Sequence, residues 1–400
     1  MPLEDLIKKA YSTFVHQYGD GGRKVTLVAA PTRIALLGGE YTEAVDGYSL
    51  LAAGNRFMVV AAQRRNDKMA VFHSLKYDEK IKANLATLKF DRADGWANYP
   101  KGVVYLYERT GRKVEGIQMV LHSDMAEDVN QGISSAIEVA TGVACNALGN
   151  NPLDDATLVK LCQRVETQFM GLRGDYSTPY AIKFAKKDQV VLFDARTFKP
   201  EYAPFDGSRF KLVVIDSGVR KKERDEEFKK RLDLFNQLLL EIRKHVPKII
   251  SLRDVPADLY EDARKKIDIL LRKRLDHVIY ENQRVRKGKD LLAKGDYAGF
   301  GQLMSESHDS LAEKMKATCQ EVDILTAVIR RQAGCLGSRM AGIGWGGPVV
   351  CLVRAAEAET FVERVKAEYK KQVNIYPQAF IEEPQEGARE VEAPVAPATH

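Results

Sequence analysis

Residues 337–350 have the sequence GSRMAGIGWGGPVV, and this run is the most informative stretch of the 400-residue chain. Glycines stand close together between apolar residues at 342–347, a density that core packing alone does not require. Glycine permits positive φ and the close approach of another backbone or of a ligand. The run therefore predicts a tight loop that leads into a strand at 349–353. Taken alone, it would also fit a glycine-rich hairpin that binds no ligand.

A second distinctive stretch lies near the N-terminus, where residues 30–48 have the sequence APTRIALLGGEYTEAVDGY. Together with the glycine run, it resembles motifs of the galactokinases, which are members of the GHMP family of small-molecule kinases. Further similar stretches follow in the same order: WANY at 96–99, DSGVR at 216–220 and GAR at 387–389. The resemblance is colinear from about residue 6 to residue 389. On this basis the chain is identified as a galactokinase-like member of the GHMP family.

Hydrophobic periodicity predicts a mixture of helices and strands. Short β-rich segments bounded by turns predict strands, whereas apolar residues at helical spacing predict helices. The expected strands cover residues 25–30, 57–63, 69–73, 117–121, 190–193, 212–215 and 349–353. The expected helices cover residues 135–148, 158–169, 223–244, 256–274, 281–294, 300–316 and 321–333. The resemblance implies that they form an α+β, two-domain GHMP-kinase fold with the site in the cleft between the domains.

The predicted domain division follows the same resemblance. An N-terminal GHMP domain of galactokinase type is expected at 1–205 and a C-terminal GHMP domain at 206–391. The polar, proline-containing stretch 198–209 fits a loop or a domain joint. The last residues, 392–400, lack apolar periodicity and are expected to form a loose tail.

Composition restricts the classes of partner. The chain is 45% hydrophobic and 29% charged, as is normal for a globular protein. Its net charge of +6 is small beside 61 basic and 55 acidic residues, so it is weak evidence for nucleic-acid binding. Five scattered cysteines fit buried thiols in a reducing compartment, and seven dispersed histidines show no zinc-type pattern. Without a signal peptide or a stretch of membrane-spanning length, we expect a cytoplasmic protein that binds neither nucleic acid nor membrane.

A sugar kinase needs a cradle for the triphosphate of ATP, ligands for Mg²⁺ and groups that position the attacking hydroxyl. Small residues before a helix N-terminus suit the first task, because exposed N–H groups and the helix dipole favour anions. Residues 130–136, NQGISSA, provide that setting, although an ordinary serine cap on a core helix fits them nearly as well. The resemblance implies nucleotide contacts from Gly132, Ser134 and Ser135, with Ser134 also the magnesium contact.

The resemblance implies further nucleotide contacts outside this loop, from Trp96, Tyr99, Gly342 and Gly344. The loop itself departs from the family pattern, because Asp128 and Asn130 stand where the family has glycines. A carboxylate at Asp128 adds repulsion toward a triphosphate, which magnesium must offset.

The catalytic positions also depart from the family. Arg33 is retained and is expected to stabilise the transferring phosphoryl group. The family's catalytic aspartate falls on Thr178, and a threonine cannot act as a general base at neutral pH. Asp175, three positions earlier, could replace it if the loop is rebuilt, or it could simply belong to a turn. The expected sugar-binding positions are Glu40, Tyr41, Glu43 and Phe228, of which Glu40 keeps the family residue.

Two functions remain open at this point. The colinear motifs favour an ATP-dependent, magnesium-dependent sugar kinase of galactokinase type that phosphorylates the anomeric hydroxyl of galactose or a related sugar. The concentration of departures at functional positions favours a catalytically silent galactokinase paralogue, which binds sugar or nucleotide as a sensor or as the partner of another protein. A third class, a pure scaffold, would bind no ligand at all.

Overall fold

The structure is a computed structural model that describes residues 1–127, 129 and 132–394. It divides into two compact units, each of which is discontinuous in sequence. Unit 1 takes in Met1–Arg33, Ala53–Lys187 and the chain from Gln385 onward. Unit 2 takes in Ile34–Ala52 and Asp188–Pro384. Both units combine helices with strands, which confirms the predicted two-part α+β fold.

The contiguous domains predicted at 1–205 and 206–391 differ from this division. The reason is the length of two strands, β1 (Thr26–Leu37) and β2 (Tyr48–Arg64), which contribute residues to both units. The segment between them therefore belongs to unit 2, and the chain returns to unit 1 at Gln385. Most of the tail predicted at 392–400 lies outside the described residues, as do Asp128 and Asn130.

The sheet of unit 1 has the strand order β12-β1-β2-β5-β3-β4. Strands β3 and β5 pair in parallel, whereas the pairs β2 with β5, β3 with β4 and β1 with β12 are antiparallel. The remaining strands of this sheet are β3 (Met69–Ser74), β4 (Glu79–Asn84), β5 (Ile117–Ser123) and β12 (Arg389–Val391).

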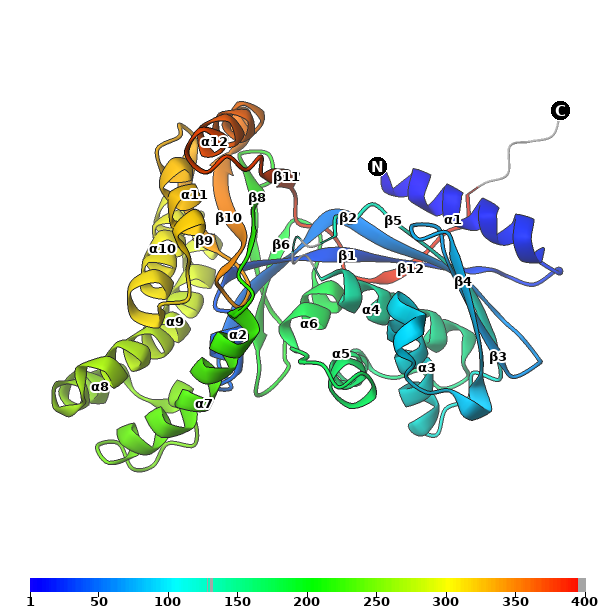
Figure 1. Ribbon diagram of the computed structural model, residues 1–400, viewed down its shortest axis with the longest axis horizontal. Helices are drawn as coiled ribbons and strands as arrows, with labels where there is room; N and C mark the ends of the chain where they lie inside the picture. Colours follow the sequence, from blue (N-terminus) through cyan, green and yellow to red (C-terminus); the bar gives the residue numbers. More distant parts are fainter. Residues whose placement is uncertain (128, 130–131, 395–400) are drawn as a thin grey trace. The chain divides into compact units, whose positions relative to one another are not determined.

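Helices cover both faces of this sheet, as Figure 1 shows: α1 lies on one face and α3 to α6 on the other. Because successive strand residues point to opposite faces, Leu27 and Ala29 pack with α1, whereas Val28 and Ala30 pack in the second cluster, with α4. β1 is therefore buried along its length. The helices are α1 (Leu3–Tyr18), α3 (Asn98–Arg109), α4 (Ile133–Leu148), α5 (Asp155–Arg164) and α6 (Ser177–Phe184).

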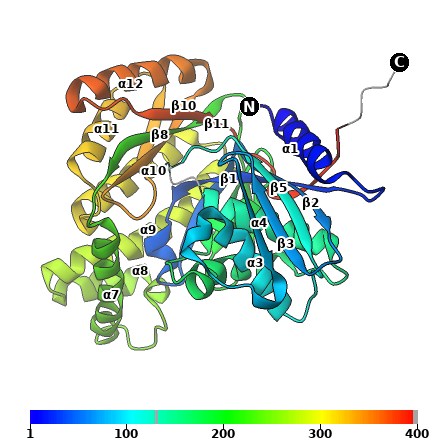
Figure 2. The same cartoon turned by 45° about the vertical axis from the view of Figure 1, so that its right-hand side comes forward.

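Unit 2 is built on a four-stranded antiparallel sheet with the order β11-β8-β10-β9. Helices α10, α11 and α12 contact its strands, which Figure 2 shows beside β8 and β10. A short hairpin of β6 (Gln189–Asp194) and β7 (Glu201–Pro204) pairs with the first residues of β2. The sheet strands are β8 (Phe210–Arg220), β9 (Cys335–Met340), β10 (Gly346–Arg354) and β11 (Gln378–Glu382).

The helices of unit 2 correct part of the sequence prediction. The helices are α2 (Glu40–Glu43), α7 (Arg224–Arg243), α8 (Ala257–Ala263), α9 (Ile269–Ala293), α10 (Tyr297–Ser310), α11 (Gln320–Arg330) and α12 (Ala358–Val373). The helix predicted at 256–274 and the break predicted before 281 are wrong: α8 stops early and α9 is continuous. Asp268 explains the new start, since its carboxylate accepts a hydrogen bond from the Leu270 amide at 2.8 Å and caps α9.

Two further sequence expectations can be compared with the fold. The cysteines, all within the described residues, are unpaired, and Cys145, Cys162 and Cys351 are buried, which agrees with the prediction of buried thiols. Within the described residues, none of the helices combines the length and the apolar character needed to cross a membrane.

The glycine run receives a packing explanation that the sequence did not suggest. Its first residues form strand β9, and a Cβ on Gly337 would lie 1.8 Å from the carbonyl oxygen of Gly301 in α10. A Cβ on Gly344 would lie 2.2 Å from the Ala317 oxygen, and one on Gly346 would lie 2.1 Å from the Val219 oxygen. The expectation that core packing alone does not require the glycines at 342–347 is therefore wrong for Gly344 and Gly346.

The contact between β9 and α10 predicts that Gly337→Ala destabilises the protein by about 2 kcal/mol, because backbone atoms must move to admit the methyl group. Urea unfolding followed by circular dichroism measures the change. Gly207→Ala is the matched control, since a Cβ there would meet nothing within 4 Å. Equal stability of the two variants would contradict the packing explanation.

Candidate functional site

Other residues can approach the N-terminus of α4 closely because the residue before the helix is a glycine. Gly132 has φ 80°, in the left-handed region, and precedes Ile133, the first residue of the helix. A Cβ on Gly132 would lie 2.6 Å from Cγ2 of Thr178 and 3.7 Å from Cβ of Arg33. Glycine is thus required both by the backbone conformation and by the space. The arrangement brings the helix N-terminus, which favours anions, against two residues that the sequence predicted to be catalytic.

Ser134, the predicted magnesium contact, lies in the same turn and pairs with a residue that the sequence analysis missed. Its hydroxyl donates a hydrogen bond to Oε1 of Glu166 at 3.1 Å. Burial raises the pKa of Glu166 to about 7, and the charge of Asp175 adds to the effect. Sequence offered no signal for Glu166, which is one glutamate among many and lies 32 positions from its partner.

Ser134 and Glu166 fit a magnesium ion. Mg²⁺ prefers oxygen ligands, and proteins often bind it through one or two side chains while substrate phosphates and water complete the shell. Among the described residues, no three His, Cys, Asp or Glu side chains converge as a metal-binding group. A hydroxyl and a carboxylate beside an anion-favouring helix N-terminus therefore suit a magnesium ion that arrives with a phosphate.

Arg33, Thr178 and Asp175 form a chain of hydrogen bonds. Nε and Nη2 of Arg33 donate to the Thr178 hydroxyl at 3.2 and 2.9 Å, and this hydroxyl donates to Oδ2 of Asp175 at 3.1 Å. Arg33 and Thr178 are both 4% exposed. The structure therefore brings together the retained arginine, the threonine at the aspartate position and the carboxylate proposed as its replacement.

Asp175 also fixes the start of α6. Its Oδ1 accepts hydrogen bonds from the amide of Thr178 at 2.7 Å and from the hydroxyl of Ser177 at 2.9 Å. Burial acts to raise the pKa of Asp175, but the Arg33 charge and the bonds from Thr178 outweigh it and hold the pKa below its usual range. Asp175 is half-buried and ionised at neutral pH, and its carboxylate satisfies backbone and hydroxyl donors at the start of α6.

A third carboxyl group, Glu138, lies one turn further along α4 from Ser134. Its side chain is 1% exposed, and among the described residues neither of its oxygens has a hydrogen-bond partner. Burial, with the charges of Glu166 and Asp175, raises its pKa well above the ordinary value. Burial therefore favours the neutral form of Glu138, which adds no negative charge beside the helix N-terminus.

An apolar pocket adjoins the same end of α4. The rings of Trp96 and Tyr77 stack with centroids 6.0 Å apart at 22°, and Ile133 and Ile137 of α4 line the pocket with them. Trp96 Nε1 donates to Glu79 at 2.7 Å. Tyr99 does not line this pocket; burial raises its pKa to about 12, with Glu166 and Glu138 contributing. A flat apolar group in this pocket would lie next to the turn that favours anions.

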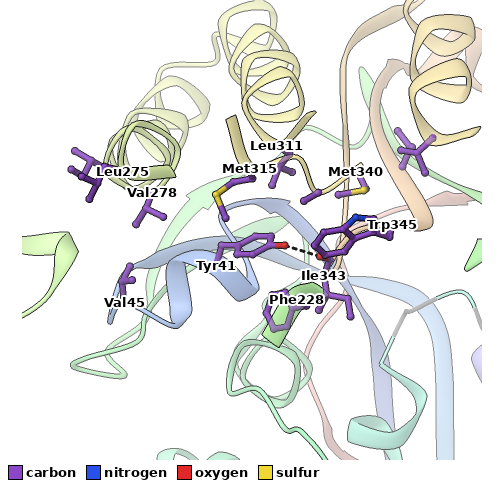
Figure 3. Close-up of a cluster of buried hydrophobic side chains, with 14 of the residues drawn as sticks. Tyr41, Val45, Phe228, Leu275, Val278, Leu311, Met315, Met340, Ile343 and Trp345 are labelled. Carbon is purple, nitrogen blue, oxygen red and sulfur yellow. Dashed lines mark hydrogen bonds between the residues drawn. The ribbon is translucent and has the colours of Figure 1, made fainter. Parts of the chain in front are cut away.

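The predicted sugar-binding residues lie in unit 2. Tyr41 and Phe228 pack against each other with ring centroids 5.0 Å apart, and the Tyr41 hydroxyl donates to the Ile343 carbonyl at 3.0 Å (Figure 3). Both residues belong to the buried cluster drawn in that figure. Glu40 is 7% exposed and Glu43 is half-buried, at the two ends of α2.

The remaining predicted nucleotide positions have different surroundings. Ser135 is buried in α4, and Gly344 is buried against the backbone of Ala317. Gly342 is half-buried and has φ 88°. Contacts from these three residues to a nucleotide stay predictions.

Known proteins resemble this chain in sequence over nearly its full length. Residues 98–181 match the family described as "GHMP kinases N terminal domain" and residues 289–371 that described as "GHMP kinases C terminal". A galactokinase of Clostridium acetobutylicum is 30% identical over 366 residues, which cover 90% of this chain and 94% of that protein. One of Clostridium tetani is 29% identical over 96% of this chain and 98% of that protein.

Solved structures resemble it as well. The Lactococcus lactis galactokinase complexed with galactose superimposes with a TM-score of 0.87 at 25% identity, covering 95% of this chain and 98% of that one. A mevalonate kinase of Methanococcus jannaschii, at 17% identity and a TM-score of 0.60, shares the fold.

The raised pKa of Glu166 predicts a pH dependence of stability. A carboxyl group whose pKa is higher in the folded than in the unfolded state lowers the free energy of unfolding at pH values where it must ionise. For Glu166 this destabilisation grows from about pH 4.5 to about pH 7. Glu166→Gln keeps an acceptor for Ser134 and removes the cost. In EDTA, the variant should exceed the wild type in unfolding free energy by about 1–3 kcal/mol at pH 8 and by much less at pH 5.

Urea unfolding at both pH values measures this difference. Glu4→Gln, on an exposed part of α1, controls for the removal of one carboxylate. A gain for Glu166→Gln that is the same at both pH values would show that Glu166 is not the titrating group.

Proposed function

The chain belongs to the galactokinase-like members of the GHMP kinase family, and on that premise we propose that it is an ATP-dependent kinase that phosphorylates the anomeric hydroxyl of galactose or a related sugar. One observation carries the proposal: Arg33 and the Ser134–Glu166 pair both lie at the N-terminus of α4. Phosphoryl transfer depends mainly on positioning and on electrostatic stabilisation, and these groups supply both.

Each part of ATP has a suitable place in unit 1. In the proposal the adenine binds beside Trp96 and Tyr77, and the two stacked rings must shift to admit it because the pocket they line has a volume of only about 10 Å³. The phosphates extend over the first turn of α4 toward Arg33. Magnesium, held by Ser134 and Glu166, would neutralise charge on the phosphates. Burial favours the neutral form of Glu138, which keeps the negative charge near the triphosphate low. Contacts from Gly342 and Gly344 to the nucleotide belong to the proposal as well.

We assign the proton acceptor to Asp175 rather than to Thr178. The Thr178 hydroxyl donates to Asp175 and accepts from Arg33, whereas Asp175 is ionised beside Arg33 and only half-buried. In the step, the sugar oxygen attacks the γ-phosphorus while the bond to the bridging oxygen breaks. The proton of the sugar hydroxyl passes to Asp175, and ADP leaves with the bond electrons.

The second candidate is a silent paralogue that binds sugar or nucleotide. It is favoured by the two hydrogen bonds that Oδ1 of Asp175 accepts as a helix cap, since a capping carboxylate has fewer lone pairs for a substrate. Product analysis separates the candidates. A sugar phosphate detected by ³¹P NMR supports the kinase; thermal stabilisation by a sugar or by ATP without any product supports the silent protein.

The choice of sugar is a separate question for the same assay. The Tyr41 hydroxyl already bonds Ile343, and Phe228 has no hydroxyl, so neither offers a free donor for a sugar in this arrangement. The panel of substrates should therefore include sugars that differ from galactose at single hydroxyl groups.

If Arg33 stabilises the transferring phosphoryl group, Arg33→Ala lowers kcat roughly 10²–10³-fold. Arg33→Lys keeps the charge but loses the paired donors to Thr178, and it should also be slow. Sugar-dependent release of ADP, measured with a coupled assay, gives the rates. Arg65→Ala, which removes a half-buried arginine from the same unit, should leave the rate unchanged. Wild-type kcat in folded Arg33→Ala would remove Arg33 from the mechanism.

Asp175→Asn separates the two roles of Asp175, because asparagine caps a helix as well as aspartate does but cannot accept the proton. We expect a folded protein with a lower melting temperature, because the neutral amide loses the attraction to Arg33, and a kcat about 10²-fold lower. Steady-state kinetics and thermal denaturation on the same preparation measure both. An unchanged kcat would leave Asp175 as a cap alone.

A further inference from the structure

Two neighbouring residues of α9 hold both ends of the segment that carries the predicted sugar-binding positions. This segment, residues 38–47, connects β1 to β2 and contains α2; it is called the α2 loop below. Oε1 of Glu281 accepts a hydrogen bond from the amide of Gly38 at 2.9 Å. Oδ1 of Asn282 accepts one from the amide of Tyr48, also at 2.9 Å. The first residue of the loop and the residue that follows it are thus fixed to the same turn of α9.

Glu281 is itself rigidly held. It is 1% exposed, and Oε1 also accepts from the Ser307 hydroxyl at 2.6 Å, while Oε2 accepts from Nε of Arg284 at 2.7 Å. Burial acts to raise the pKa of Glu281, but Arg284 and Arg339 outweigh it and bring the pKa to about 2. Glu281 is therefore a fixed, ionised acceptor at neutral pH.

Arg339 of β9 completes the attachment of the first loop residue. Its Nη2 donates to the carbonyl oxygen of Gly38 at 2.9 Å and lies 4.0 Å from Oε1 of Glu281. Both backbone groups of Gly38 are thus bound by this pair. The side chains at these two positions bind both backbone polar groups of one residue, which a pair of apolar side chains could not do.

The glycines at the two ends of the loop pack closely against neighbouring atoms. A Cβ on Gly38 would lie 2.3 Å from the Tyr48 oxygen, and one on Gly47 would lie 2.2 Å from Oδ1 of Asn282. In the middle of the loop, Tyr41 is anchored in the buried cluster of Figure 3. A shift of either end would therefore carry Glu40 and Glu43 with it.

We propose that Glu281 and Asn282 are positioning residues that set where the α2 loop presents Glu40 and Glu43, and hence how tightly the sugar binds. The proposal rests on the proposed function and on the expectation from the sequence that Glu40 and Glu43 bind the sugar. A buried ion pair often adds little net stability compared with apolar side chains, and its better-supported contribution is to specify one geometry. Glu281 and Asn282, called the clamp below, supply such a geometry, because two acceptors on one helix bind two amides at the ends of one loop.

The test compares Asn282→Ala and Glu281→Gln with the wild type. Asn282→Ala removes the acceptor for Tyr48, and Asn282→Asp restores it as the conservative rescue. The matched control is Asp276→Asn on the same helix, because Asp276 is equally buried, at 5% exposed, but bonds Tyr260 and Arg264 instead of the loop. The readouts are hydrogen exchange of peptides that cover 38–48 and the KM values for sugar and for ATP.

We expect faster exchange of these peptides in Asn282→Ala, with a sugar KM about tenfold higher, the equivalent of one lost hydrogen bond. Glu281→Gln keeps an acceptor for the Gly38 amide but loses the ion pair with Arg284, so it should change both readouts in the same direction by a smaller amount. The KM for ATP should stay within about twofold, and Asn282→Asp should recover most of the sugar KM. Asp276→Asn should change neither the exchange nor the sugar KM.

A folded Asn282→Ala with wild-type exchange and wild-type sugar KM would overturn the proposal, as would an equal effect in Asp276→Asn. If the wild type phosphorylates no sugar, the proposed function fails by itself. The exchange measurement then decides on the clamp, and loop exchange in Asn282→Ala no faster than in Asp276→Asn would overturn it.

Discussion

Arg33 sets the constraint on which the site in unit 1 depends. Its guanidinium is 4% exposed, and a buried charge without acceptors is strongly destabilising. The Thr178 hydroxyl accepts two of its N–H groups, and Asp175 holds that hydroxyl in turn. Gly132 packs against the same side chains, which is possible because it has no Cβ. These contacts hold three segments of unit 1 together: the start of α4, the start of α6 and the part of β1 that ends at Arg33.

Three carboxyl groups near that point differ in charge because their neighbours differ. Arg33 and the Thr178 bonds keep Asp175 ionised, whereas burial dominates at Glu138, raises its pKa and favours its neutral form. Glu166 lies between them, with a pKa of about 7. Groups whose pKa values are pushed apart in this way can take different roles, one as an acceptor of protons and another as a ligand for a cation. A cluster of three ionised carboxylates would instead repel a triphosphate.

The sequence predicted this site in part, and its failures have physical causes. Arg33, Gly132, Ser134 and Thr178 lie in recognisable motifs, and the fold brings them together. Glu166 was missed because its role arises from a contact across the fold, and no local pattern reports such a contact. Mixed charges along 256–294 hid the start of α9, which depends on one cap, Asp268. The packing role of the glycine run was missed because it also depends on contacts across the fold. The atoms that exclude a Cβ from this run belong to distant residues such as Gly301 and Val219.

The residues that differ from the family pattern make specific contacts, and these contacts bear on whether the site has decayed or has been rebuilt. If the site had only decayed, the substituted side chains would be expected to lie loosely, with unsatisfied polar atoms or poor packing. Tyr41 instead packs on Phe228 and bonds Ile343, and Thr178 satisfies the arginine that the family aspartate would face. Tyr41, Phe228 and Thr178 thus have specific partners, and the loop around Tyr41 is fixed at both ends by α9. Such mutual adjustment is what selection for a rebuilt binding site produces, and it favours a protein that still binds a ligand over a scaffold from which the function has drifted away.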